Sequence, residues 1–121
     1  MKVILPVENR SLHVPVCPSF GRTPWFVSYD TDTGSHEYLN NAATASQGGA
    51  GIKAAQLLAD HGAKAVITYR LGENAAKVLD AAGIELFMAR DGTVMEHIEK
   101  FKSGALERLI EIHPGHHHHG G

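Results

Sequence analysis

The hydrophobic and polar positions of the chain follow two different periods, which divide it into two parts. The first part contains two short segments rich in β-branched or aromatic residues, over 2–7 and 25–29, and a third strand candidate over 35–39. This composition is typical of strands. The polar residues 30–34 between the second and third segments favour a tight turn, so we expect these two strands to form a hairpin.

From Ile52 onward the apolar positions recur at helical spacing. Ile52 and Leu58 share one face of a helix, and Gly62 is a natural stop for it. Thr93 and Glu96 have the spacing of a capping box, which marks the start of a further helix. The expected elements of this part are a helix over 52–62, a strand over 64–69, a helix over 72–82, a strand over 84–87, a helix over 93–101 and an amphipathic segment of open type over 105–112.

The order of these elements, β-β-β-α-β-α-β-α, predicts an α/β fold. The alternating part requires parallel strands joined by helical crossovers, whereas the hairpin requires antiparallel neighbours. We therefore expect a five-stranded mixed sheet flanked by helices, similar to ribonuclease H-like folds, with a ferredoxin-like arrangement as the alternative. Residues 1–112 would form one domain, and residues 113–121 a flexible tail rich in His and Gly.

Composition narrows the class of protein. The chain has 121 residues, of which 43% are hydrophobic and 20% charged, as expected of one soluble domain. A formal net charge of −2 argues against a basic nucleic-acid-binding protein. The chain shows no apolar run of membrane-spanning length and no signal-peptide pattern. A cytoplasmic monomer that contacts neither nucleic acid nor membrane is the expectation.

The one cysteine of the chain, Cys17, lies in a proline-flanked loop and excludes an internal disulfide. We expect its side chain to be partly exposed. A thiolate is a soft ligand for iron–sulfur species, zinc or copper(I), although an inert buried cysteine is the alternative. Arg22, in the same loop, could help to hold an anionic ligand.

A glycine-rich segment, Gly48-Gly49-Ala50-Gly51, directly precedes the first predicted helix. The first amides of a helix lack partners within it and, together with the helix dipole, attract an anion. The competing interpretation is that these glycines only allow the helix to pack closely on the sheet. The spacing also matches a dinucleotide-binding fingerprint, but no acidic residue follows at the required distance, which argues against nicotinamide binding.

Gly72 and Asn74 come at the carboxyl end of a predicted parallel strand, at the start of a helix. Ligands of open α/β sheets bind at such positions. A tight turn without a ligand would give the same pattern.

Histidines concentrate at the C-terminus. Four consecutive residues, His116, His117, His118 and His119, follow His113 within the tail. Neutral imidazoles bind divalent metals, so we interpret the tail as a possible metal-binding segment, with a fragment of a purification tag as the alternative. We expect most of the other histidines to lie on the surface.

Motifs of catalysis are missing from the sequence. It contains no P-loop, no Cys-x-x-Cys and no His-Glu-x-x-His, and no nucleophile–base pair can be named. We expect a protein that is not an enzyme.

Several segments, taken together and in order, resemble the dinitrogenase iron-molybdenum cofactor-binding family. They span residues 1 to about 110. The segments are Phe20-Gly21-Arg22, residues 25–30, Gly48-Gly49-Ala50-Gly51-Ile52, Ala65-Val66-Ile67, Gly72-Glu73-Asn74-Ala75, Gly83-Ile84-Glu85-Leu86, Thr93-Val94 and Gly104-Ala105-Leu106.

The resemblance implies a ribonuclease H-like fold that binds a metal–sulfur cluster, of iron–sulfur or iron–molybdenum–sulfur type, and delivers it to an assembly or acceptor protein. Together with the residues identified above, it predicts a cofactor site made by Cys17, Ser19, Arg22, residues 48–51, Gly72 and Asn74. Family members commonly have a histidine where this chain has Ser19, and Cys17 could supply the replacement ligand. The alternatives are a metal-ion buffer or metallochaperone that acts through the tail, and a regulatory domain that binds a small anion or nucleotide.

Overall fold

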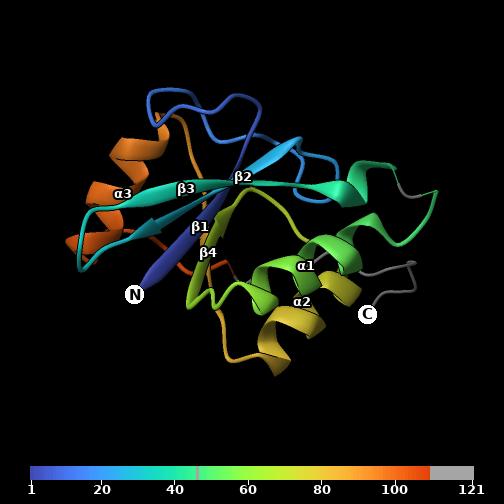
Figure 1. Cartoon of the computed structure of the whole chain (residues 1–121). Coiled ribbons are helices and arrows are strands. Elements are labelled where there is room, and N and C mark those ends of the chain that lie inside the picture. The colour runs from blue at the N-terminus through green and yellow to red at the C-terminus, as the bar shows by residue number, and fades with distance from the viewer. Residues whose placement is uncertain (46, 110–121) are drawn as a thin grey trace.

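The computed structural model describes residues 1–45 and 47–109 as one α/β unit (Figure 1). Its centre is a five-stranded sheet with the order β3-β2-β1-β4-β5. The strands are β1 (Lys2–Val7), β2 (Trp25–Asp30), β3 (His36–Asn40), β4 (Ala65–Thr68) and β5 (Glu85–Met88). The helices are η1 (Ala42–Ala45), a 3-10 turn, and the α-helices α1 (Ala50–Asp60), α2 (Glu73–Ala81) and α3 (Val94–Lys102).

The sheet is mixed, as the order of elements predicts. Strand β1 pairs with β4 in parallel, and β4 pairs with β5 in parallel. Strand β2 lies antiparallel to both β1 and β3. This arrangement differs from the ferredoxin-like alternative, because three neighbouring strands run in the same direction.

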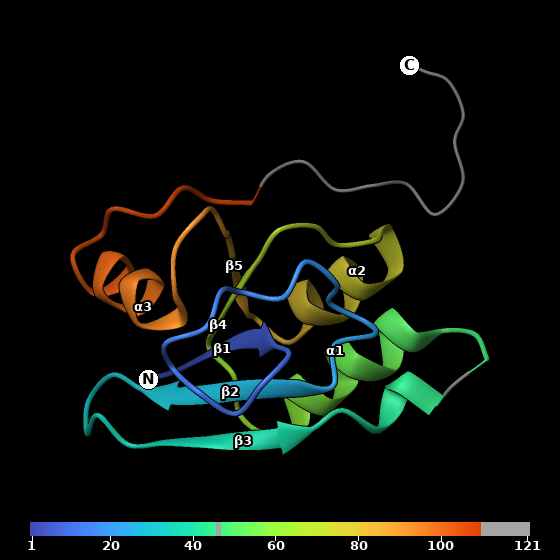
Figure 2. The same ribbon diagram turned by 90° about the horizontal axis from the view of Figure 1, so that it is seen from above.

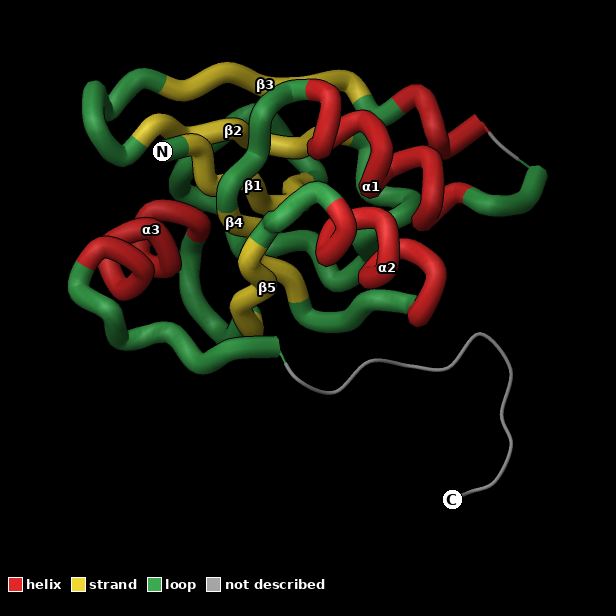
Figure 3. The backbone as a smooth tube through the Cα atoms, turned by 90° about the horizontal axis from the view of Figure 1, so that it is seen from below, coloured by secondary structure: helices red, strands yellow, loops and turns green. Residues whose placement is uncertain are grey.

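The two faces of the sheet are covered by different helices. Helices α1 and α2 pack side by side on one face, and α3 covers the other (Figures 1 and 3). Strand β4 is buried on both faces: Val66 points to α1 and α2, whereas Ala65 and Ile67 point to α3. None of the helices within residues 1–45 and 47–109 is both long and apolar enough to cross a membrane.

The C-terminal part of the described chain closes one edge of the sheet. Its residues Glu107 and Leu109 pair with β5: the Met88 N–H donates to Glu107 O at 2.9 Å and the Leu109 N–H to Leu86 O at 3.0 Å. The segment that the sequence left open is therefore extended over these residues. It covers the edge of β5, which would otherwise present unpaired backbone groups.

Helix α3 begins at the predicted capping box. Thr93 Oγ1 accepts the Glu96 N–H at 3.2 Å, and the Thr93 N–H donates to Glu96 Oε1 at 2.7 Å. The second bond holds the pKa of the Glu96 carboxyl below its ordinary value. Its contribution to stability is therefore complete at neutral pH and is lost as the pH falls through that lowered pKa.

His97, expected to lie on the surface with most other histidines, is instead buried. Both of its ring nitrogens have partners, since Nδ1 donates to Thr93 O at 2.7 Å and Nε2 accepts the Arg90 N–H at 3.0 Å. These two bonds require the tautomer of His97 that carries its hydrogen on Nδ1. The histidine thus fixes the turn before α3.

We predict that Thr93→Ala lowers the free energy of unfolding by about 1 kcal/mol, because it removes the side-chain cap of α3. Urea denaturation at neutral pH measures the change. Thr93→Ser keeps the capping oxygen and should stay within a few tenths of a kcal/mol of the wild type. An equal loss in both variants would contradict a capping role.

Candidate ligand site at the carboxyl ends of the strands

Four connections meet at one edge of the sheet. Strands β1, β3, β4 and β5 run in the same direction, so their carboxyl ends lie at the same end of the sheet. The segments that leave them lead to β2, α1, α2 and α3. The chain continues from β1 to one side of the sheet and from β4 to the other. Such a reversal point is where ligands of open α/β sheets bind.

Glycine brings the β1–β2 loop, at residues 8–24, into backbone contact with α1 (Figure 2). A Cβ atom added at Gly21 would lie 3.0 Å from Gly51 N and 3.2 Å from Gly51 Cα. A Cβ atom at Gly51 would in turn lie 3.5 Å from Ala75 Cβ of α2. These three small residues join the loop to the first turns of both helices.

Two of the helices that begin at this end of the sheet, α1 and α2, lack side-chain caps. The N-cap residues are Gly49 for α1 and Gly72 for α2, and neither provides a side-chain hydrogen bond. Gly49 adopts a φ of 70°, a left-handed conformation that favours glycine. Helix α3, by contrast, has a complete capping box. The positive dipole ends and uncapped first turns of α1 and α2 therefore lie at the end of the sheet where β1 and β4 have their carboxyl ends.

A cavity of about 270 Å³ lies between the β1–β2 loop and the β4–α2 loop. Its lining residues come from both loops: Pro18, Phe20, Gly21, Arg70, Leu71 and Gly72. The structure thus brings together segments that are about fifty residues apart in sequence. Arg70 gives the cavity a positive wall, which suits an anionic ligand.

The expectation that Cys17 is partly exposed is wrong. Its side chain is 6% exposed, because its backbone N–H donates to Pro6 O at 2.8 Å and ties the residue to β1. The following residue, Pro18, lines the cavity, but Cys17 does not. The loop that carries Cys17 reaches the first turn of α1 through Gly21.

The other residues predicted for the site lie around this cavity or near it. Ser19 Oγ accepts the Arg22 N–H at 3.1 Å, which closes a turn inside the loop. Arg22 is exposed, and its Nη1 donates to Thr44 O of η1 at 3.1 Å. Asn74 is exposed in the first turn of α2. Gly48 and Gly49 are exposed, whereas Ala50 is buried beneath them.

Asn41 is a residue of this region that the sequence did not indicate. It is 1% exposed, and its Nδ2 donates to Gly21 O at 3.0 Å and to Thr23 O at 2.8 Å. Its Oδ1 accepts the Ala43 N–H at 3.2 Å, an Asx turn. The sequence could have indicated the local turn, because an asparagine precedes a stretch of small residues here. It could not have indicated the bonds to Gly21 and Thr23.

Thr68, the last residue of β4, is the second residue that the sequence missed. It is fully buried, and its Oγ1 has no hydrogen-bond partner in residues 1–45 and 47–109. Strand alternation puts its side chain on the same face as Val66, toward α1 and α2. An unpaired polar atom therefore lies at the end of the strand that leads into the cavity loop.

Tyr69 anchors the beginning of that loop. Its hydroxyl donates to Arg90 O at 2.8 Å. Burial, together with the nearby charge of Asp91, raises the pKa of Tyr69 above its ordinary value. The tyrosine remains a neutral donor at physiological pH and joins the loops that follow β4 and β5.

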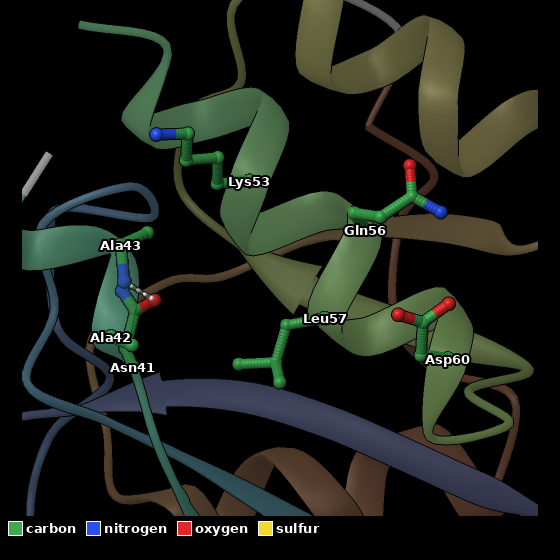
Figure 4. A pocket seen from close by; sticks show the side chains of 7 residues that line it. All are labelled: Asn41, Ala42, Ala43, Lys53, Gln56, Leu57 and Asp60. Carbon is green, nitrogen blue, oxygen red and sulfur yellow. Dashed lines mark hydrogen bonds between the residues drawn. The ribbon is translucent and has the colours of Figure 1, made fainter.

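A larger open groove of about 540 Å³ lies between η1 and α1 (Figure 4). Leu57 forms its apolar floor, and Lys53, Gln56 and Asp60 lie along α1 on one side of it. Asn41 lies on the opposite wall. The same asparagine thus borders this groove and holds the loop of the smaller cavity.

Within the part of the chain that the structure describes, no three His, Cys, Asp or Glu side chains come close enough to hold a metal ion. The predicted tail ligands, His113 and residues 116–119, lie outside the described residues. The domain therefore offers one thiol and backbone amides rather than a set of protein ligands for a bare ion.

Comparison with known proteins identifies related chains along nearly the whole length. The model of the family "Dinitrogenase iron-molybdenum cofactor" matches residues 1–104. An uncharacterized protein of Methanocaldococcus jannaschii is 32% identical over 112 residues, which cover 90% of this chain and 92% of the relative.

Two solved structures are similar in both fold and sequence. The apo form of the orange protein from Desulfovibrio gigas is 34% identical with a TM-score of 0.86, covering 90% of this chain and 92% of that one. A Thermotoga protein described as a candidate NifB protein is also 34% identical, with a TM-score of 0.79 and coverage of 91% and 94%.

We predict that Gly21→Ala lowers the free energy of unfolding by about 1–3 kcal/mol, because the new Cβ meets the backbone of α1. Gly48→Ala is the matched control, since a Cβ there meets nothing within 4 Å. Urea denaturation compares the two. Equal midpoints would show that the loop can move away from α1 without loss.

We predict that Thr68→Val raises the free energy of unfolding by about 1–3 kcal/mol, because it removes an unpaired buried hydroxyl. Thr23→Val is the control, since Thr23 is equally buried but its Oγ1 donates to Val7 O at 2.8 Å. This control should be destabilised. A loss of stability in both variants would mean that Thr68 has a partner in solution.

Proposed function

The chain belongs to the dinitrogenase iron-molybdenum cofactor family, and from this premise we propose that it binds a metal–sulfur cluster and carries it to another protein. The cluster, of iron–sulfur or iron–molybdenum–sulfur type, is the cargo. The protein is a carrier on a ribonuclease H-like framework in the cytoplasm and catalyses no reaction of its own.

One observation carries the proposal: two uncapped helix N-termini converge with the Cys17 loop at the reversal point of the sheet. Amides at such ends have no partner within the helix and favour an anion. Thr68 adds a buried hydroxyl without a partner among the described residues. These groups can donate hydrogen bonds to a ligand that accepts several.

The chemistry of the available donors fits a preassembled cluster better than a bare ion. Sulfide-rich clusters are anionic and accept hydrogen bonds from amides. They bring most of their own metal ligands, so a protein with one thiol can hold them. A lone divalent ion would need three or more protein ligands, which residues 1–45 and 47–109 do not bring together.

Each residue of the proposed site has a distinct task. Cys17 supplies the soft ligand after the loop at Pro18 shifts, since its thiol is buried in the unloaded protein. Ser19 keeps the loop turned, and Arg22 adds positive charge. Backbone amides supply the remaining contacts, from residues 48–51 at the start of α1 and from Gly72 and Asn74 at the start of α2.

Weak binding suits a carrier, because the cargo must leave. One metal–thiolate bond and several hydrogen bonds can be exchanged with a partner that offers more ligands. The partner is therefore an assembly or acceptor protein with a richer set of thiolates or imidazoles.

We predict that anaerobic reconstitution of the full chain with ferric and ferrous iron and sulfide gives visible charge-transfer absorption, and that Cys17→Ala loses most of it. Absorption spectra and iron analysis after desalting measure the outcome. A wild type without absorption would refute cluster binding. The same absorption in the variant would remove Cys17 from the ligand set.

The histidine tail requires its own control, because it could bind iron independently of the domain. A variant of the full chain with His116, His117, His118 and His119 replaced by alanine should keep the absorption. If it loses both absorption and iron, the tail is the metal-binding segment, and the chain acts as a metal-ion buffer instead.

A further inference from the structure

Asn41 contacts the β1–β2 loop through both its backbone and its side chain. The residue follows β3 directly, and its backbone N–H donates to Pro24 O at 3.0 Å. Its amide group donates to the carbonyl oxygens of Gly21 and Thr23 and accepts the Ala43 N–H. One buried side chain thus joins the β1–β2 loop to η1.

An asparagine is the side chain that these three partners require. The two loop partners are carbonyl oxygens and the third is an N–H, so the group must offer two donors and one acceptor. An aspartate has the same shape but no donor when ionised. It would face two carbonyl oxygens at the distances where Asn41 now donates.

One of the two carbonyl groups that Asn41 binds belongs to Gly21, the residue that contacts α1. Gly21 lies so close to Gly51 that an added Cβ would come within 3.0 Å of its backbone nitrogen. Gly21 also lines the cavity of about 270 Å³. The Asn41–Gly21 bond therefore ties the residue that contacts the first turn of α1 to the start of η1.

We propose that Asn41 is a positioning residue of the cargo site: it holds the Gly21 end of the Cys17–Arg22 loop in place, while the segment at Pro18 moves to expose the Cys17 thiol. The proposal rests on the proposed function. Asn41 does not touch the cargo. It acts by preventing the loop from moving away from α1, which would separate the soft ligand from the amides. Hydrogen-bond donors that are already in place bind a ligand more tightly than donors in a loop that must first become ordered, because ordering costs free energy.

The test compares Asn41→Asp with Asn40→Asp. The control makes the same chemical change one residue earlier, at an exposed position of β3. Both full-length variants are loaded anaerobically with ferric and ferrous iron and sulfide, and the loss of absorption is followed after a chelator is added. We expect Asn41→Asp to release its iron about tenfold faster or more, since two hydrogen bonds are lost, and Asn40→Asp to behave as the wild type.

A second measurement on the unloaded proteins separates positioning from general destabilisation. In ¹H–¹⁵N spectra, Asn41→Asp should shift the amides of Gly21, Thr23 and Gly51 and leave those of α3 unchanged. Equal release rates in the two variants, or unshifted Gly21 and Gly51 amides, would overturn the proposal. If the wild type forms no cluster, the proposed function fails, and the amide shifts alone decide whether Asn41 positions the loop.

Asn41→Ser serves if the aspartate variant does not fold. Its hydroxyl oxygen can still accept the Ala43 N–H, but it offers one donor in place of two. Faster release with shifted Gly21 and Gly51 amides is expected again. Wild-type release with wild-type shifts would overturn the proposal.

Discussion

The β1–β2 loop contacts the first turn of α1 through the backbones of Gly21 and Gly51. This close approach requires that Gly21 has no side chain. The contact does more than close a gap in packing. It sets the depth of the cavity, brings the loop of Cys17 beside two helix N-termini, and makes the carbonyl of Gly21 available to Asn41. The β1–β2 loop, the first turn of α1 and Ala75 of α2 are positioned relative to this one contact.

Side chains cap the start of α3, whereas the starts of α1 and α2 have no side-chain cap. At the start of α3, the side chains of Thr93, Glu96 and His97 each hydrogen-bond to backbone groups of the turn. At the starts of α1 and α2 glycines replace capping side chains, and Thr68 is left without a partner among the described residues. An unpaired buried polar group costs stability, so the Thr68 hydroxyl marks this end of the sheet as the place to look for a ligand.

Local patterns predicted the elements well. The bounds of β1 and the capping box of α3 are confirmed, and the order of elements gives the mixed sheet. Helix α1 begins at Ala50, two residues before its predicted start at Ile52, because periodicity detects apolar faces and not the glycine cap that precedes them. The burial of Cys17 was missed for a related reason: proline-rich loops are usually exposed, and its bond to Pro6 is a contact between distant segments.

The sequence by itself determined the secondary structure, the glycine-rich start of α1 and the family of the protein, because each depends on short segments of chain. The tertiary structure decided which segments meet. Asn41 donates to residues about twenty positions away, Gly21 touches a helix thirty residues later, and Leu109 completes the edge of β5. No periodicity encodes such pairs, since they arise only after the sheet brings the carboxyl ends of β1 and β4 together.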